Sequence, residues 1–111
     1  MTDQPSAPEV GFDDLAAALE AGAPVIDVRN PDEYEQVRVP GVRLIPLPEL
    51  GQRVEEVPQG ERVYVICAAG GRSLAAATAL NQAGLDAVSV AGGTNGWAAE
   101  GRPVESGPVT P

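Results

Sequence analysis

One cysteine, followed at a short distance by an arginine, is the part of this chain whose residue types and spacing can do chemistry. Cys67 opens a segment of small residues that continues as Ala68, Ala69, Gly70, Gly71, Arg72 and Ser73. Glycine lets a tight loop turn several backbone N–H groups toward one point, where they bind an anion. Arg72 adds a positive charge, so residues 67–72, hereafter the Cys67 loop, are expected to stabilise a thiolate.

A stabilised thiolate is a nucleophile. A free thiol has a pKa of about 8.5, so only a few per cent is ionised at neutral pH. Lowering this pKa by about two units needs about 2.7 kcal/mol of preferential thiolate stabilisation, which amide hydrogen bonds, a helix N-terminus and Arg72 can supply. Transfer of sulfur from thiosulfate or a persulfide suits this group, because the leaving group is already a stable anion and needs no general acid.

Histidine is absent, which removes several alternatives. A Ser-His-Asp triad, a Cys-His pair and a zinc site of thiolate and imidazole ligands all need it. Carboxylates alone can hold a metal in principle, but we expect no metal and no cofactor. A lone cysteine after a buried strand is most often a small hydrophobic residue, and the composition of the Cys67 loop favours the nucleophile instead. The simpler roles are a surface ion pair for Arg72 and a helix N-cap for Ser73, and we expect Ser73 to act mainly as the cap.

Short apolar strands alternate with helical patterns along the chain, as in a parallel α/β sheet. The predicted strands are residues 25–28, 43–45, 63–66 and 87–90. The predicted helices cover residues 12–19, 46–54, about 73–83, and 95–100. A further helix is predicted to start at residue 31, after the N-cap Asn30. Functional loops of such sheets lie at the carboxyl ends of strands, so one edge should hold residues 27–29, the Cys67 loop and residues 91–93.

Several short motifs occur in a family order. They are Ile26-Asp27-Val28-Arg29, Pro31-Asp32-Glu33-Tyr34, Val39-Pro40-Gly41-Val42, Ile45-Pro46-Leu47, Cys67 to Ser73, and Gly92-Gly93 with Gly96-Trp97. With these motifs the chain resembles the rhodanese homology domain over residues 9–103. The resemblance implies a three-layer α/β fold, in which helices flank a central five-stranded parallel sheet. It also implies a single-domain sulfurtransferase.

The resemblance implies roles for individual residues. Cys67 corresponds to the residue that forms a persulfide, and residues 68–72 to the loop that cradles the substrate. Asp27 and Arg29 correspond to the first signature and are expected to brace the loops near the site. Trp97 corresponds to the second signature, where packing of the last helix is favoured over substrate contact. Glu33 is expected to serve as a helix-start carboxylate, with an ion pair to Arg29.

Two departures from the family pattern affect the expected substrate. Family members commonly have Gly-His where this chain has Val37 and Arg38, a change that concerns local loop geometry away from Cys67. Loops that favour thiosulfate often carry extra cations, whereas the Cys67 loop has only Arg72. A neutral or protein-bound persulfide therefore fits the site as well as thiosulfate does, and Arg38 or Arg43 are the other cations that can be near its mouth.

The chain carries a formal net charge of −9, and all seven of its cationic residues are arginines. This balance argues against nucleic acids and anionic membranes as partners. The expected partners are a small sulfur donor and acceptor, or a protein that carries a persulfide. Residues 1–8 and 104–111 are predicted to be disordered tails. The N-terminus lacks the basic and apolar segments of a signal peptide, and the chain has a single cysteine, so we expect a cytoplasmic location. The size of the chain favours a monomer.

Two other function classes remain. A related phosphatase or arsenate reductase also presents a cysteine loop to an oxyanion, but its Cys-x5-Arg loop is one residue longer than the Cys-x4-Arg found here. A non-catalytic binding module of the same fold typically lacks the cysteine that this chain keeps. Within the main interpretation, the protein is either a thiosulfate sulfurtransferase or a relay that receives persulfide from a partner.

Overall fold

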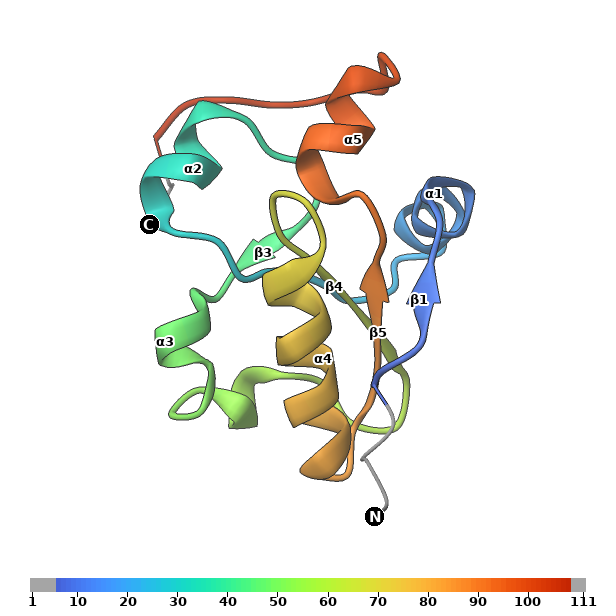
Figure 1. The fold of residues 1–111 in the computed structure, drawn as a ribbon, viewed down its shortest axis with the longest axis vertical. Coiled ribbons are helices and arrows are strands. Elements are labelled where there is room, and N and C mark those ends of the chain that lie inside the picture. Colours follow the sequence, from blue (N-terminus) through green and yellow to red (C-terminus); the bar gives the residue numbers. More distant parts are fainter. Residues whose placement is uncertain (1–5, 109–111) are drawn as a thin grey trace.

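The buried apolar runs of the sequence form the strands of a five-stranded parallel sheet. The structure is a computed structural model that describes residues 6–108 (Figure 1). The strands are β1 (Glu9–Val10), β2 (Val25–Asp27), β3 (Arg43–Leu44), β4 (Arg62–Ile66) and β5 (Asp86–Val90). Their order across the sheet is β1-β5-β4-β2-β3, and all neighbouring pairs are parallel. The predicted α/β fold class is confirmed.

Helices cover both faces of the sheet. They are α1 (Phe12–Glu20), α2 (Pro31–Gln36), α3 (Leu47–Leu50), α4 (Gly71–Gln82) and α5 (Gly93–Ala99), with a 3₁₀ turn η1 at Val54–Glu56. Side chains alternate between the two faces of a strand. Val63 and Val65 of β4 thus share a core with α3 and α4, and Tyr64 and Ile66 share one with α1 and α5.

The path of the chain sets the position of the site. After β2 the chain forms β3 at one edge of the sheet and then returns to place β4 on the other side of β2 (Figure 1). Asp27 at the end of β2 is in register with Ile66 at the end of β4. The segments that follow these two strands therefore begin side by side, at the point where parallel sheets commonly bind ligands.

Two helices begin earlier than the sequence suggested. The residues before them, Gly70 and Gly92, adopt left-handed backbone conformations with φ of 116° and 84°. Only glycine takes such angles without strain, so each provides a sharp turn directly from loop into helix. The predicted helix over residues 46–54 is instead two pieces, α3 and η1.

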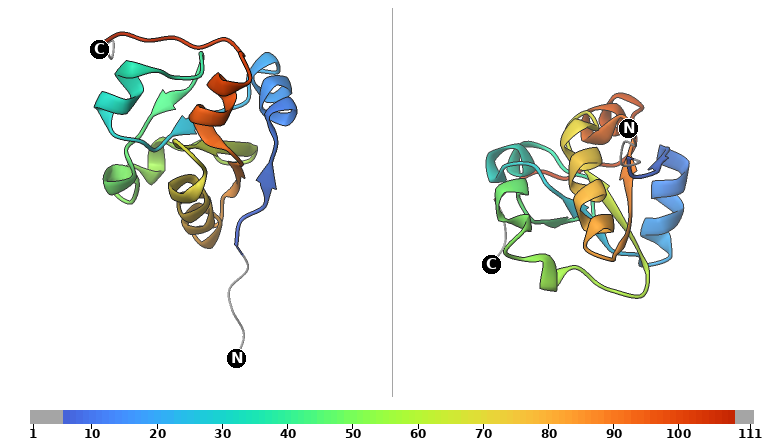
Figure 2. Two further views of the ribbon diagram at one scale, coloured as in Figure 1. Left: turned by 45° about the horizontal axis from the view of Figure 1, so that its top comes forward. Right: turned by 60° about the horizontal axis from the view of Figure 1, so that its bottom comes forward.

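Parts of the two predicted tails make hydrogen bonds to the rest of the domain. The backbone N–H of Ala7 donates to Thr78 Oγ1 at 3.0 Å, and Pro8 accepts a hydrogen bond from Ser89. After α5 the chain runs back to α2, where Glu105 pairs with Arg38 in an antiparallel bridge (Figure 2). Hydrogen bonds that the sequence pattern did not reveal thus hold Ala7, Pro8, Glu105 and Gly107. The rest of the tail prediction, for residues 1–5 and 109–111, lies outside the described residues.

Within the described chain, the helices are too short for any of them to cross a lipid bilayer.

Candidate active site

Cys67 directly follows β4, and the loop behind it folds so that amides face its sulfur. The N–H of Gly70 donates to Cys67 Sγ at 3.1 Å, and the thiol lies 3.4 Å from Ser73 Oγ. The backbone N–H groups of Ala69 and Ser73 also favour the charged sulfur. This is the inward-facing nest of N–H donors that the small residues predicted.

Contacts with the start of α5 turn the loop in this direction. The N–H groups of Thr94 and Asn95 donate to the carbonyls of Cys67 and Ala68 at 2.8 and 3.0 Å. In a trans peptide the carbonyl and the N–H point in opposite directions. A carbonyl of Ala68 held toward α5 therefore directs the N–H of Ala69 away from α5.

Gly93 makes this contact possible, a role at the site that its residue type alone does not reveal. A Cβ atom at Gly93 would lie 2.4 Å from the carbonyl oxygen of Ala68 and 2.6 Å from that of Cys67. Those distances leave no room for any side chain. The Gly92-Gly93 pair was a visible signal, but only the packing of α5 against the Cys67 loop shows what the second glycine does.

Ser73 is not the helix N-cap that we predicted. Because Gly70 is the N-cap and α4 begins at Gly71, Ser73 lies within the first turn of the helix and is fully buried. Its hydroxyl donates to the carbonyl of Gly70 at 3.2 Å and lies 2.8 Å from Ser89 Oγ. Together with its contact to Cys67, this makes Ser73 part of the sulfur's environment.

Opposing effects act on the ionisation of Cys67. Burial raises the pKa of the Cys67 thiol, while hydrogen bonds from the hydroxyl and N–H of Ser73 and from the N–H groups of Gly70 and Ala69 lower it. The hydrogen bonds prevail, and the pKa lies below its ordinary value. Cys67 is only 1% exposed. A donor thus reaches the sulfur only if it presents a slim terminal atom or if the loop moves.

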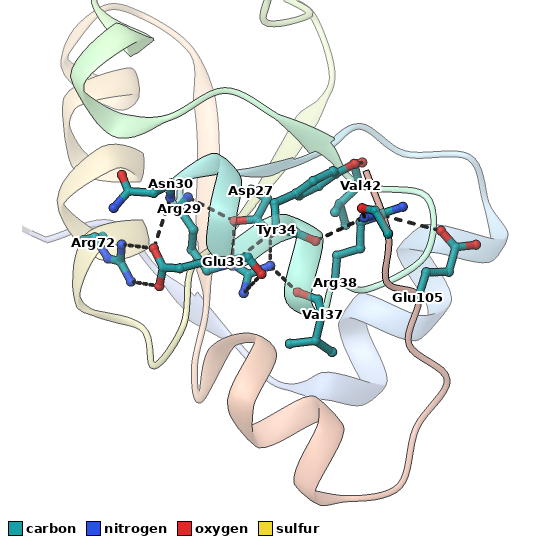
Figure 3. Close-up of polar contacts among 11 residues, drawn as sticks. Asp27, Arg29, Asn30, Glu33, Tyr34, Val37, Arg38, Val42, Arg72 and Glu105 are labelled. Atoms are coloured by element: carbon teal, nitrogen blue, oxygen red, sulfur yellow. Dashed lines mark hydrogen bonds and ion pairs between the residues drawn. The ribbon is translucent and has the colours of Figure 1, made fainter. Parts of the chain in front are cut away.

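Arg72 is held by a carboxylate from α2. Its two terminal nitrogens donate to the two oxygens of Glu33 at 2.8 and 2.9 Å (Figure 3). The same carboxylate accepts the N–H of Asn30 at the start of α2 at 3.0 Å. Chiefly through the hydrogen bonds from Arg72, against an opposing effect of burial, the pKa of Glu33 falls to about 2. The ion pair of Glu33 with Arg29 that we expected is therefore wrong, because Arg72 takes its place.

Arg29 pairs instead with Asp27, and both side chains are buried. The guanidinium donates to the Asp27 carboxylate at 2.7 to 3.0 Å and also to the carbonyl of Val37 at 2.7 Å (Figure 3). A buried charge pair of this kind needs all of its hydrogen bonds. The pair ties the end of β2 to the end of α2, the helix that carries Glu33.

The other residues considered for the site have contacts elsewhere. Trp97 is buried, its indole N–H donates to the carbonyl of Pro103 at 2.7 Å, and its ring meets Phe12 edge to face. These are packing contacts. Arg38 interacts with Glu105, and Arg43 with Glu56.

A groove of about 260 Å³ lies between α3 and α4, away from the Cys67 loop. It is lined by Leu47, Leu50, Gly51, Val54, Ala79, Leu80 and Ala83. Because none of these residues can act as a nucleophile, an acid or a base, the candidate active site remains at Cys67. Over residues 6–108, no cluster of three or more cysteine, aspartate or glutamate side chains is arranged to hold a metal ion.

The chain is similar to several known proteins in sequence and in fold. The family model of the rhodanese-like domain matches residues 12–100. The thiosulfate sulfurtransferase PspE of Escherichia coli is 40% identical over 87 residues, which cover 71% of this chain and 84% of that protein. A sulfurtransferase of Allochromatium vinosum is 32% identical over 81 residues, covering 72% of this chain and 76% of the relative.

Among solved structures, a rhodanese-related protein from Thermoplasma volcanium superposes with a TM-score of 0.82 at 35% identity. The alignment covers 88% of this chain and 97% of that one. Matches to three larger curated relatives span only 40%, 48% and 21% of their lengths. The chain thus corresponds to one part of those proteins.

Proposed function

The chain belongs to the rhodanese-like domain family, and from this premise we propose that it is a sulfurtransferase that carries sulfane sulfur on Cys67. The single observation that carries the proposal is the geometry at Sγ, where the N–H of Gly70 and the hydroxyl of Ser73 surround a sulfur whose pKa is lowered. A cysteine that served only for packing would gain nothing from donors that favour its charged form.

In the first half of the proposed reaction, the Cys67 thiolate attacks the outer sulfur of a donor. With thiosulfate, an S–S bond forms between Sγ and that sulfur, the S–S bond of thiosulfate breaks, and its electron pair leaves with sulfite. The cysteine is oxidised to a persulfide as thiosulfate is reduced. Three negative charges enter and three leave, so no proton is needed.

In the second half, an acceptor such as cyanide or a thiolate attacks the outer sulfur of the Cys67 persulfide. The electron pair of the S–S bond returns to Sγ and restores the thiolate. Between the two halves the persulfide anion must be held without loss to water. The N–H groups of the Cys67 loop supply fixed partial positive charges for this purpose.

A phosphatase reaction fits the site less well. It needs an arginine whose guanidinium is free to bind a phosphate and an acid for the leaving alkoxide. Both terminal nitrogens of Arg72 are already bound to Glu33.

Intact-mass measurement tests the proposal. The protein is incubated with thiosulfate or with 2-hydroxyethyl persulfide, and we expect an adduct with the mass of one sulfur atom. Cyanide should remove the adduct and release thiocyanate, and Cys67→Ser should form none. Failure of the protein to take up sulfur from either donor would favour a non-catalytic binding module of the same fold.

A further inference from the structure

Every side-chain cation of this protein is already paired with a carboxylate. The seven arginines are the only lysine or arginine residues in a chain of net charge −9. Each lies within 4.0 Å of an aspartate or glutamate oxygen: Arg29, Arg38, Arg43, Arg53, Arg62, Arg72 and Arg102. A doubly charged anion thus meets no uncompensated side-chain cation at the site.

Arg72 is the only one of these arginines in the Cys67 loop, and Glu33 occupies its binding edge. The two terminal nitrogens form two parallel hydrogen bonds to one carboxylate, the arrangement in which arginine also binds oxyanions. The pair is part-buried, with exposed fractions of 38% for Arg72 and 29% for Glu33. The sulfonate of thiosulfate would have to displace Glu33 to use Arg72, and it would still face the freed carboxylate.

We propose that Glu33 determines donor specificity, by holding Arg72 and neutralising the only cation of the loop, so that organic persulfides are preferred over thiosulfate. This inference rests on the proposed sulfur transfer and narrows it. Glu33 acts through Arg72 and is a positioning residue, since its carboxylate binds Arg72 whereas the hydrogen bonds at Cys67 Sγ involve Gly70 and Ser73.

The two donors differ in the charge that the site must accept. Thiosulfate brings two negative charges next to the Cys67 thiolate and leaves as doubly charged sulfite. A persulfide RS–SH in its neutral form brings none. The thiolate attacks its outer sulfur, the RS–S bond breaks, and RS⁻ leaves with the electron pair. The proton of the new Cys67 persulfide then passes through solvent to RS⁻, which leaves as the thiol. The backbone N–H groups are sufficient for this smaller charge.

Glu33→Gln tests the inference, with Asp32→Asn as the matched control. The glutamine amide keeps an oxygen that can accept the N–H of Asn30, but its NH2 group cannot accept a hydrogen bond from Arg72. The substitution therefore removes the charge and one of the two hydrogen bonds that hold the guanidinium. Asp32 is an exposed carboxylate on the same turn of α2, so its loss changes the net charge equally and leaves Arg72 paired. The readouts are kcat and KM for thiosulfate and for 2-hydroxyethyl persulfide, measured by cyanolysis.

We expect Glu33→Gln to raise kcat/KM for thiosulfate by about fivefold, a change of about 1 kcal/mol that suits a part-exposed charge pair. The change should appear mostly in KM. For the persulfide, kcat/KM should change by less than about twofold. Asp32→Asn should change kcat/KM for neither donor. The double variant Glu33→Gln with Arg72→Gln should lose the gain, because the freed guanidinium is its source.

The inference would be overturned if the ratio of kcat/KM for thiosulfate to kcat/KM for the persulfide were unchanged in a folded Glu33→Gln protein. An equal gain in kcat/KM for thiosulfate in Asp32→Asn would also overturn it. Thermal melting shows whether the variant is folded. If it is not, Glu33→Asp, which is too short to hold both nitrogens of Arg72, replaces it with the same expected direction. Failure of the wild-type protein to form a persulfide with either donor would instead defeat the proposed function itself.

Discussion

At the scale of single residues, the balance between the thiol and thiolate forms of Cys67 depends on the direction in which the Ser73 hydroxyl points. In the thiol form, Cys67 donates to Ser73 Oγ, and the Ser73 hydroxyl donates to the carbonyl of Gly70. A thiolate cannot donate, so on ionisation the Ser73 hydroxyl must turn toward the sulfur. Ser89, 2.8 Å away, can then donate to Ser73 Oγ. The two serines therefore form a short relay that favours the charged sulfur.

Ser73→Ala should raise the pKa of the Cys67 thiol, because a hydrogen bond that favours the charged sulfur is lost. Burial, which opposes ionisation, would remain while one stabilising donor is lost. The measurement is the pH dependence of the rate at which iodoacetamide alkylates Cys67. The midpoint should move to higher pH, with a smaller move in the same direction for Ser89→Ala. A midpoint that stays in place in Ser73→Ala would show that the backbone N–H groups act alone.

Glu33 should also make stability depend on pH. Its pKa falls from 4.5 to about 2 in the folded protein. Between these values the unfolded chain binds more protons, so stability rises with pH there and is lost as the pH falls toward 2. Urea unfolding at a series of pH values should show a shallower slope in this window for Glu33→Gln than for the wild-type protein. Equal slopes would mean that other carboxylates carry the dependence, and Asp32→Asn provides the control.

At the scale of helices and strands, local signals predicted much of the fold. The apolar runs around Ile26 and Val65 and the cap at Asn30 identify their elements, because each signal lies within a few residues. The sequence pattern missed β1, because Glu9–Val10 is too short to show alternation and becomes a strand only by pairing with β5. The resemblance to the family supplied that fifth strand.

Local sequence patterns do not encode contacts between residues that are far apart in the chain, which explains which parts of the site were missed. The Cys67 loop is contiguous, so residue types alone suggested its chemistry. The pairing of Arg72 with Glu33 joins residues that are 39 positions apart. It depends on the packing of α2 beside the loop, which no local pattern encodes. The start of α4 was misplaced by about two residues, because the left-handed turn at Gly70 could not be told from an ordinary loop glycine.

Gly93→Ala tests how firmly α5 sets the loop. The new Cβ would overlap the carbonyls of Cys67 and Ala68, and φ at Gly93 is +59°, a strained angle for alanine. We expect a loss of about 1 to 3 kcal/mol in stability, typical of overpacking, together with slower alkylation of Cys67. Gly51→Ala is the matched control, because a Cβ there meets nothing within 4 Å and its backbone is helical. Normal alkylation in Gly93→Ala would show that α5 does not fix the orientation of the loop.

At the scale of the whole molecule, the chain carries a large net negative charge. A net charge of −9, with every arginine next to a carboxylate, repels anionic donors before they reach the Cys67 loop. Because each arginine is held in an ion pair, it contributes little to the attraction of an anionic donor at long range. The N–H groups around the sulfur act only at contact distance. The approach of a donor and its binding are therefore governed by different groups.

Salt separates these two effects. Raising the ionic strength from about 0.01 M to about 0.15 M shortens the screening length from about 30 Å to about 8 Å. For thiosulfate, kcat/KM should rise several-fold, because screening weakens the repulsion between two negative bodies. For 2-hydroxyethyl persulfide, which carries at most one charge, the rise should be smaller. The measurement is cyanolysis at fixed pH over a series of sodium chloride concentrations. A fall in kcat/KM for thiosulfate with added salt would instead mean that a cation attracts the donor, and Arg72 would be the residue to test, because it is the arginine nearest in sequence to the sulfur.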